Sequence, residues 1–170
     1  MRSIYALLLL LLAAISAAAQ TTDPLRRQGE STIIAFQMAD SSKYVSVCQS
    51  QSLENSYIVY RFGTSSKVEL EYPKDLSNSW NEFESSYYFR GGGASNEGLD
   101  LNYIRFTSGS WEYVVYQEYS AESSTTSVGI RLTRLKDGKK YDLHGKPDTL
   151  QGSLVPLRDN DRIPQGDPPN

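Results

Sequence analysis

The chain has 170 residues, of which 39% are hydrophobic and 22% are charged, and its formal net charge is −3. Its 17 Lys and Arg residues are outnumbered by 20 Asp and Glu residues, so there is no basic excess to favour nucleic-acid phosphates as partners. The single cysteine excludes an intramolecular disulfide framework and any cysteine-rich metal site. A chain of this length predicts one domain.

The first 19 residues have the pattern of a secretory signal peptide. Arg2 precedes the apolar run Ile4–Ile15, and Ala17 and Ala19 form the small-x-small pattern before Gln20, the expected first residue after cleavage. The apolar run is shorter than the roughly 20 residues that a membrane-spanning helix needs, although an uncleaved signal anchor is the alternative. The sequence therefore predicts a periplasmic or secreted protein with no integral membrane segment after cleavage.

The remaining chain divides into three parts. Residues 20–31 are polar and predict a flexible lead-in, residues 32–157 predict a β domain, and residues 158–170 carry three prolines and predict a disordered tail. Apolar and polar side chains alternate through the β domain, most clearly in Lys67–Tyr72, as in strands with one face on a core and one in water. The expected strands are Thr32–Met38, Lys43–Gln49, Tyr57–Phe62, Lys67–Tyr72, Phe83–Arg90, Leu99–Thr107, Trp111–Tyr119, Val128–Leu135, Lys139–His144 and Thr149–Leu157.

These segments predict an all-β fold, either a single antiparallel barrel or a two-sheet sandwich of about nine or ten strands. Within Leu99–Thr107 the apolar residues change sides of the strand, which predicts a β-bulge. Asp137 and Gly138 lie between two expected strands and suit a type I′ hairpin turn. No segment has the apolar stripe of an α-helix, although residues 73–82 have room for one short helical turn.

Few residues in the chain are suited to catalysis. His144 is the only histidine, with Asp142 on the same side of its strand, and no nucleophile-elbow serine accompanies them. Cys48 lies within an expected strand, which indicates a small apolar core residue; an intermolecular disulfide and a thiol dyad with His144 are the alternatives. The sequence therefore predicts no catalytic residue, no bound metal, no cofactor and no enzymatic activity.

The segment from Arg90 to Asp100 contains four glycines and joins two strongly patterned strands. One interpretation is a flexible hairpin loop, because glycine tracts permit unusual backbone angles at an entropic cost. The other is a binding loop carried on a rigid scaffold. The candidate partner-binding residues are Arg90, Gly91, Gly92, Gly93, Ser95, Asn96 and Glu97.

The expected strand Trp111–Tyr119 has aromatic rings on both faces. Such a strand is typical of a sandwich interior, but one face is also suited to recognition, because tyrosine offers a large amphipathic surface at a small rotamer cost. The candidate glycan-stacking residues are Trp111, Tyr113 and Tyr116.

The order of these features resembles the periplasmic inhibitors of C-type lysozyme, a small family of exported antiparallel barrels. The resemblance covers Tyr44 to Ile104. Its motifs are Tyr44 to Cys48, Tyr57–Tyr60, Lys67–Leu70 and the strand motif Ser85-Ser86-Tyr87, which runs on into the glycine-rich loop. A second cysteine to pair with Cys48 and the Ser-Gly-x-x-Tyr inhibitory stretch of that family are absent. The resemblance therefore implies an inhibitor-like role without assigning inhibitory residues.

The sequence thus predicts an exported non-enzymatic binding protein, such as a periplasmic inhibitor or immunity protein for a cell-wall-degrading enzyme. Its expected partner is another protein, with an exported hydrolase as the first candidate. The alternatives are an envelope glycan-binding module, a structural accessory of an envelope complex and a hydrolase that depends on His144.

Overall fold

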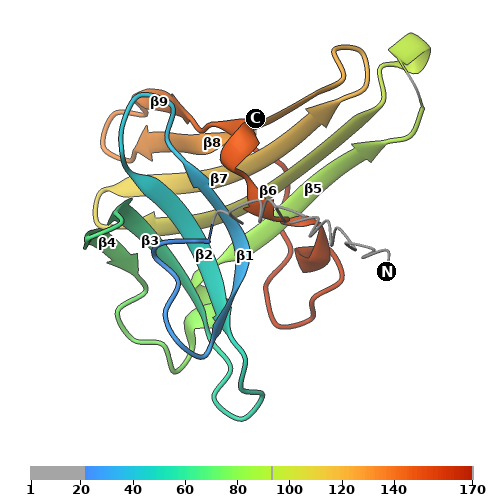
Figure 1. Cartoon of the computed structure of the whole chain (residues 1–170). Helices are drawn as coiled ribbons and strands as arrows, with labels where there is room; N and C mark the ends of the chain where they lie inside the picture. The colour runs from blue at the N-terminus through green and yellow to red at the C-terminus, as the bar shows by residue number, and fades with distance from the viewer. Residues whose placement is uncertain (1–21, 93, 170) are drawn as a thin grey trace, which may run out of the picture.

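The computed structural model describes residues 22–92 and 94–169, so the expected signal peptide (residues 1–19) and Gly93 lie outside the described residues. The described chain is all-β, as predicted, and forms two antiparallel sheets of five strands each (Figure 1). The two sheets keep separate edges. The closed-barrel alternative is therefore wrong, and the two-sheet alternative is confirmed.

The first sheet has the strand order β10-β1-β2-β3-β4. Its strands are β1 (Glu30–Gln37), β2 (Tyr44–Ser50), β3 (Ile58–Thr64), β4 (Lys67–Tyr72) and the two-residue β10 (Gln151–Gly152). The short β10 brings the region after the second sheet back against β1, so both ends of the β domain meet in this sheet.

The second sheet follows chain order, β5-β6-β7-β8-β9. Its strands are β5 (Glu84–Arg90), β6 (Leu99–Ser108), β7 (Trp111–Ser120), β8 (Thr125–Arg134) and β9 (Lys140–His144). The connections hold four short 3₁₀ helices, η1 (Ser79–Glu82), η2 (Ala94–Asn96), η3 (Pro147–Thr149) and η4 (Val155–Leu157). The predicted helical turn within residues 73–82 is thus confirmed as η1.

Two local predictions for the second sheet are wrong. No β-bulge interrupts β6, which pairs with both neighbours in unbroken register. Its apolar residues change sides because Leu101 and Tyr103 join a second apolar cluster on the outer face, while Ile104 and Phe106 point into the core. The β8–β9 connection is not a two-residue type I′ turn, since only Gly138 has positive φ and the hairpin closes between Arg134 and Lys139.

The main core lies between the facing sides of the two sheets. Alternate residues of each strand enter it, as the two-residue side-chain period requires. Phe106 is at its centre, stacked 4.8 Å from the Tyr113 ring and 4.7 Å from the Tyr72 ring, with Tyr60 and Phe83 also in contact. Ring pairs of this kind add to the stability that burial of the apolar area provides.

The segments on either side of the β domain also pack against it. Asp23 and Leu25 are buried in the segment that was expected to be a flexible lead-in. In the expected disordered tail, Ile163 joins the core and Gln165 forms a parallel bridge with Ser85 of β5. Neither segment has the alternating apolar pattern of a strand, because single side chains, and not a whole strand face, hold each segment against the β domain.

Candidate functional site

The second sheet extends past the first at the end that carries the glycine-rich loop (Figure 1, upper right). There its inner face continues beyond the core and carries two rows of side chains, each crossing three strands. One row is Phe89, Asp100 and Tyr119, and the other is Tyr87, Asn102 and Gln117. We call this surface, together with Val155 and Arg158 beside it, the cradle.

The aromatic rings of the cradle are unusually exposed for a face that begins in the core. Phe89 is 60% exposed, Tyr87 46% and Tyr119 41%. Water-exposed rings gathered on one surface are typical of recognition sites, because isolated monomers rarely leave large apolar patches uncovered. The cradle is therefore a candidate recognition surface.

Arg158 fixes the floor of the cradle. Its Nε donates a hydrogen bond to Asn102 Oδ1 at 2.8 Å, and its Nη2 donates one to Asp100. The guanidinium group also lies 4.8 Å from the centre of the Tyr87 ring and 5.9 Å from that of Phe89. One side chain therefore contacts both rows and links the Tyr87 and Phe89 rings to the Asp100 carboxylate.

A small hollow of about 150 Å³ opens beside Arg158. Its wall includes Gln117, whose Oε1 accepts hydrogen bonds from Ser153 Oγ at 3.0 Å and from the Leu154 N–H at 2.9 Å. The hollow is smaller than the pockets that enclose small-molecule ligands, so the cradle is an open binding surface with a shallow recess. Besides Gln117, the hollow is lined by Asp100, Asn102, Tyr119, Thr126 and Val155.

The predicted partner-binding loop lies at the tip of the same hairpin. Arg90 donates hydrogen bonds to the Glu97 carbonyl oxygen at 2.7 and 3.0 Å and to its carboxylate at 2.8 Å. Glu97 has a φ of 49°, and a Cβ atom on Gly98 would lie 2.5 Å from the Gly92 carbonyl oxygen, so the loop closes tightly on itself. Arg90 and Glu97 therefore clamp the two ends of the loop together, and their side chains are 40% and 59% exposed.

The three predicted glycan-stacking residues do not form one surface. Tyr113 belongs to the core, where it stacks on Phe106 with an angle of 5° between the rings. Tyr116 points to the opposite face of β7 and is buried. Trp111 lies at the other end of the strand, against Tyr141 and far from the cradle in chain register.

Tyr116 is held on the outer face of the second sheet by a polar network. Its ring lies over Gly129, where a Cβ atom would approach the Tyr116 oxygen to 2.4 Å, and its hydroxyl reaches Asp142 at 3.1 Å and His144 at 3.0 Å. Burial and the Asp142 carboxylate raise the pKa of Tyr116. His144 therefore contacts a protonated phenol, and among residues 22–92 and 94–169 no thiol or serine hydroxyl is hydrogen-bonded to it.

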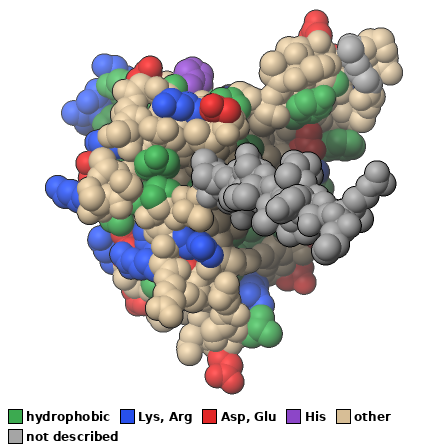
Figure 2. All heavy atoms as spheres, in the orientation of Figure 1, with side chains coloured by type: hydrophobic (Ala, Val, Ile, Leu, Met, Phe, Trp, Pro, Cys, Tyr) green, Lys and Arg blue, Asp and Glu red, His purple; other side chains and the backbone are tan. Residues whose placement is uncertain are grey.

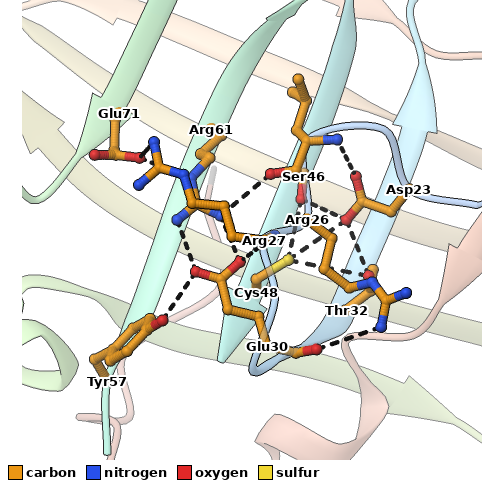
Figure 3. Close-up of polar contacts among 11 residues, drawn as sticks. Asp23, Arg26, Arg27, Glu30, Thr32, Ser46, Cys48, Tyr57, Arg61 and Glu71 are labelled. Atoms are coloured by element: carbon orange, nitrogen blue, oxygen red, sulfur yellow. Dashed lines mark hydrogen bonds and ion pairs between the residues drawn. The ribbon is translucent and has the colours of Figure 1, made fainter. Parts of the chain in front are cut away.

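Cys48 lies on the first sheet, under the segment 22–29 (Figure 3). The Asp23 carboxylate accepts hydrogen bonds from Ser46 at 2.6 Å, from Thr32 at 2.9 Å and from the Cys48 thiol at 3.4 Å. Burial, together with the Asp23 and Glu30 charges, raises the pKa of Cys48 to about 12 despite a hydrogen bond with Ser46. The thiol stays protonated and is on a different sheet from His144, which excludes the proposed dyad.

A buried ion-pair network lies beside Cys48 (Figure 3). Arg61, 1% exposed, donates hydrogen bonds to the two carboxylate oxygens of Glu30 at 2.6 and 2.7 Å and to Glu71 at 2.7 Å. Glu30 also accepts hydrogen bonds from the Arg27 N–H and the Tyr57 hydroxyl. The charges of Arg61, Glu30 and Glu71 are all paired. The network therefore has a structural role and holds the N-terminal segment against β3.

This network makes the stability of the protein depend on pH. Burial raises the pKa of Glu30, but hydrogen bonds and charge from Arg61 outweigh it and leave the pKa below its ordinary value of 4.5; the same holds for Glu71. A carboxyl with a lowered pKa in the folded state stabilises the protein above its unfolded pKa, and that stability is lost as pH falls through the folded pKa. We expect the free energy of unfolding to decrease as the pH is lowered below about 4.5.

Urea denaturation at a series of pH values measures this dependence. Glu30→Gln removes one of the two groups, so its stability should change less steeply with pH in the acidic range than that of the wild type. Parallel curves for the two proteins would contradict the assignment to Glu30.

The described residues hold no group of three or more His, Cys, Asp and Glu side chains arranged for a metal ion. In the same part of the chain, no helix is long and apolar enough to cross a membrane. Neither a scan against protein-family models nor searches of curated proteins and of solved structures finds a match for this chain.

Proposed function

We propose that this chain is an exported, non-enzymatic binding protein and that the cradle and the adjoining loop are its recognition surface. The observation that carries this proposal is the exposure of Tyr87, Phe89 and Tyr119 on one face, with an arginine against the first two rings. Tyrosine and arginine are enriched at the residues that dominate the energy of protein interfaces. Because tyrosine and phenylalanine have only two side-chain torsions, ordering these rings on binding costs little side-chain entropy.

The proposed partner is another exported protein, with a wall-degrading hydrolase as the first candidate. Two features support a protein partner: the clamped loop stands at the end of the sheet, and the cradle is an open surface rather than an enclosed pocket. A loop whose two ends are clamped together, beside an aromatic face, is suited to enter a cleft of the partner while the face covers its rim. The resemblance to lysozyme inhibitors adds the same expectation for residues 44–104.

A glycan ligand is the second candidate, and one observation favours it. In the row Phe89–Asp100–Tyr119 the two rings are two strands apart, which is about 10 Å, with a carboxylate between them. Sugar rings stack on aromatic faces while their hydroxyl groups donate hydrogen bonds to carboxylates. A saccharide chain lying across the three strands would use all three side chains at once.

The cradle proposal is tested by truncating its rings. Phe89→Ala and Tyr119→Ala should each weaken partner binding at least tenfold, because exposed rings at the centre of an interface contribute more than 1 kcal/mol each. Tyr88→Ala is the matched control: Tyr88 neighbours Phe89 in β5, is 43% exposed and points to the other face of the sheet. Proteins that co-elute with the tagged protein from its own cell envelope are identified, purified and titrated against each variant.

The same variants separate the two candidate ligands. Binding to purified peptidoglycan fragments without any second protein, lost in Phe89→Ala, would support the glycan. Binding to a purified hydrolase with loss of its activity would support the inhibitor. Equal binding by Phe89→Ala, Tyr119→Ala and Tyr88→Ala would contradict the assignment of the cradle.

A further inference from the structure

A second surface lies at the opposite end of the second sheet, where β8 turns into β9. We call it the basic apex and define it as Leu135, Lys136, Lys139, Lys140 and Tyr141. Arg134 of the same hairpin pairs with Asp137 at 2.6 Å, but none of the three lysines forms an ion pair within the described residues. Figure 2 shows Lys and Arg side chains gathered over this hairpin at the upper left.

The basic apex also presents apolar groups to solvent. Leu135 is 54% exposed at its tip, and the exposed Tyr141 ring lies 5.7 Å from that of Trp111, with the Lys139 ammonium 5.0 Å from the Tyr141 ring centre. One hairpin thus carries an exposed leucine, three lysines and a tyrosine that contacts Trp111, so apolar, amphipathic and cationic groups belong to the same short segment. Side chains of these three kinds meet at the boundary between lipid headgroups and acyl chains.

Backbone and side-chain hydrogen bonds hold the basic apex in shape. The Leu135 N–H donates to the Ser110 carbonyl oxygen at 2.9 Å, which ties this hairpin to the neighbouring β6–β7 turn. Arg134 donates two hydrogen bonds to Asp137, at 2.9 and 2.6 Å, and thereby removes the only acidic group of the turn from competition with the lysines. The backbone that carries the leucine and the lysines is thus held in one conformation.

We propose that the basic apex binds the surface of a membrane that contains anionic phospholipids, with Leu135 entering the headgroup region and the lysines facing lipid phosphates. The net charge of the chain is −3, so this positive patch is a local concentration of charge rather than a general property of the protein. A soluble polyanion would use the lysines alone and would leave the exposed leucine without a contact. Leu135 therefore favours the lipid surface.

Co-sedimentation with lipid vesicles tests this proposal. The protein should bind vesicles of phosphatidylcholine with phosphatidylglycerol, weakly and reversibly, and should not bind vesicles of phosphatidylcholine alone. Each lysine near an anionic surface strengthens binding about fivefold, so Lys136→Glu, which changes the charge by two, should weaken it about 30-fold. Leu135→Ser should weaken it by a smaller factor, and added salt should reduce it for every variant.

Lys74→Glu is the matched control, because it makes the same charge change in the exposed connection between β4 and η1 and should leave vesicle binding nearly unchanged. Absence of binding to the anionic vesicles, or equal losses in Lys74→Glu and Lys136→Glu, would overturn the proposal. Binding of heparin that is as strong as vesicle binding and insensitive to Leu135→Ser would assign the patch to a polyanion and would also overturn it. All variants lie outside the cradle, so the result is independent of the proposed partner.

Discussion

Replacing Arg61 with alanine is expected to lower the free energy of unfolding by about 3–5 kcal/mol. The change leaves the Glu30 carboxylate buried without its main counter-charge and removes hydrogen bonds of 2.6 and 2.7 Å. It also breaks one of the two ion pairs of Glu71 among the described residues and leaves the one with the more exposed Arg27. A buried charge without compensation is costly because water no longer solvates it. Urea denaturation monitored by tryptophan fluorescence measures the difference.

Two further variants identify the cause of that loss. Removing both charges in Arg61→Met with Glu30→Met should cost less than Arg61→Ala alone, since no unpaired carboxylate remains at the Glu30 position. Lys43→Ala breaks the exposed ion pair of Lys43 with Glu69, 2.6 Å long, and should cost at most about 1 kcal/mol. If Arg61→Ala were no more damaging than Lys43→Ala, the network would not be the anchor of the N-terminal segment.

The second large effect is expected at the centre of the core. Phe106→Ala should lower the free energy of unfolding by about 3–5 kcal/mol, because it removes a buried ring in contact with four others and leaves a cavity. Phe89→Ala removes the same group from the same face of the neighbouring strand, but Phe89 is exposed, so its stability should change by no more than about 0.5 kcal/mol.

Comparing the stability of Phe89→Ala and Phe106→Ala also shows whether the binding test of Phe89→Ala is valid. Loss of partner binding in Phe89→Ala is informative only if this variant folds as stably as the wild type. A loss of stability in Phe89→Ala comparable with that of Phe106→Ala would place Phe89 in the core and would remove the main support for the cradle.

The strands could be predicted from the sequence because their signal is local. In Lys67–Tyr72 the alternation of apolar and charged residues alone defines the strand, and β4 has these bounds. What the pattern does not contain is the distance over which one sheet covers the other. Tyr87 and Tyr113 both lie on the inner face of the second sheet, yet only Tyr113 meets the first sheet, so exposure could not be predicted from alternation.

Only part of the candidate surface could be predicted from the sequence. Four glycines in a short segment marked the loop, but the cradle depends on Arg158, which lies 56 residues beyond Asn102 in the chain and in a segment without periodicity. The buried ion-pair network, in contrast, has a recognisable signal in the sequence. Arg61 is a lone charge between Tyr60 and Phe62 in an apolar strand, and a charge in such a place requires a buried partner.

The length of β7 sets the spacing between the two ends of the second sheet. The strand has ten residues, from Trp111 beside the β8–β9 hairpin to Ser120 beside the cradle, and a strand of that length spans about 30 Å. A molecule bound in the cradle would stand that far above any surface that the hairpin touches. The cradle lies on β5, β6 and β7 and the basic apex on the β8–β9 turn and β9, and these strands form one hydrogen-bonded sheet. The protein would therefore act as a spacer that fixes height and angle together.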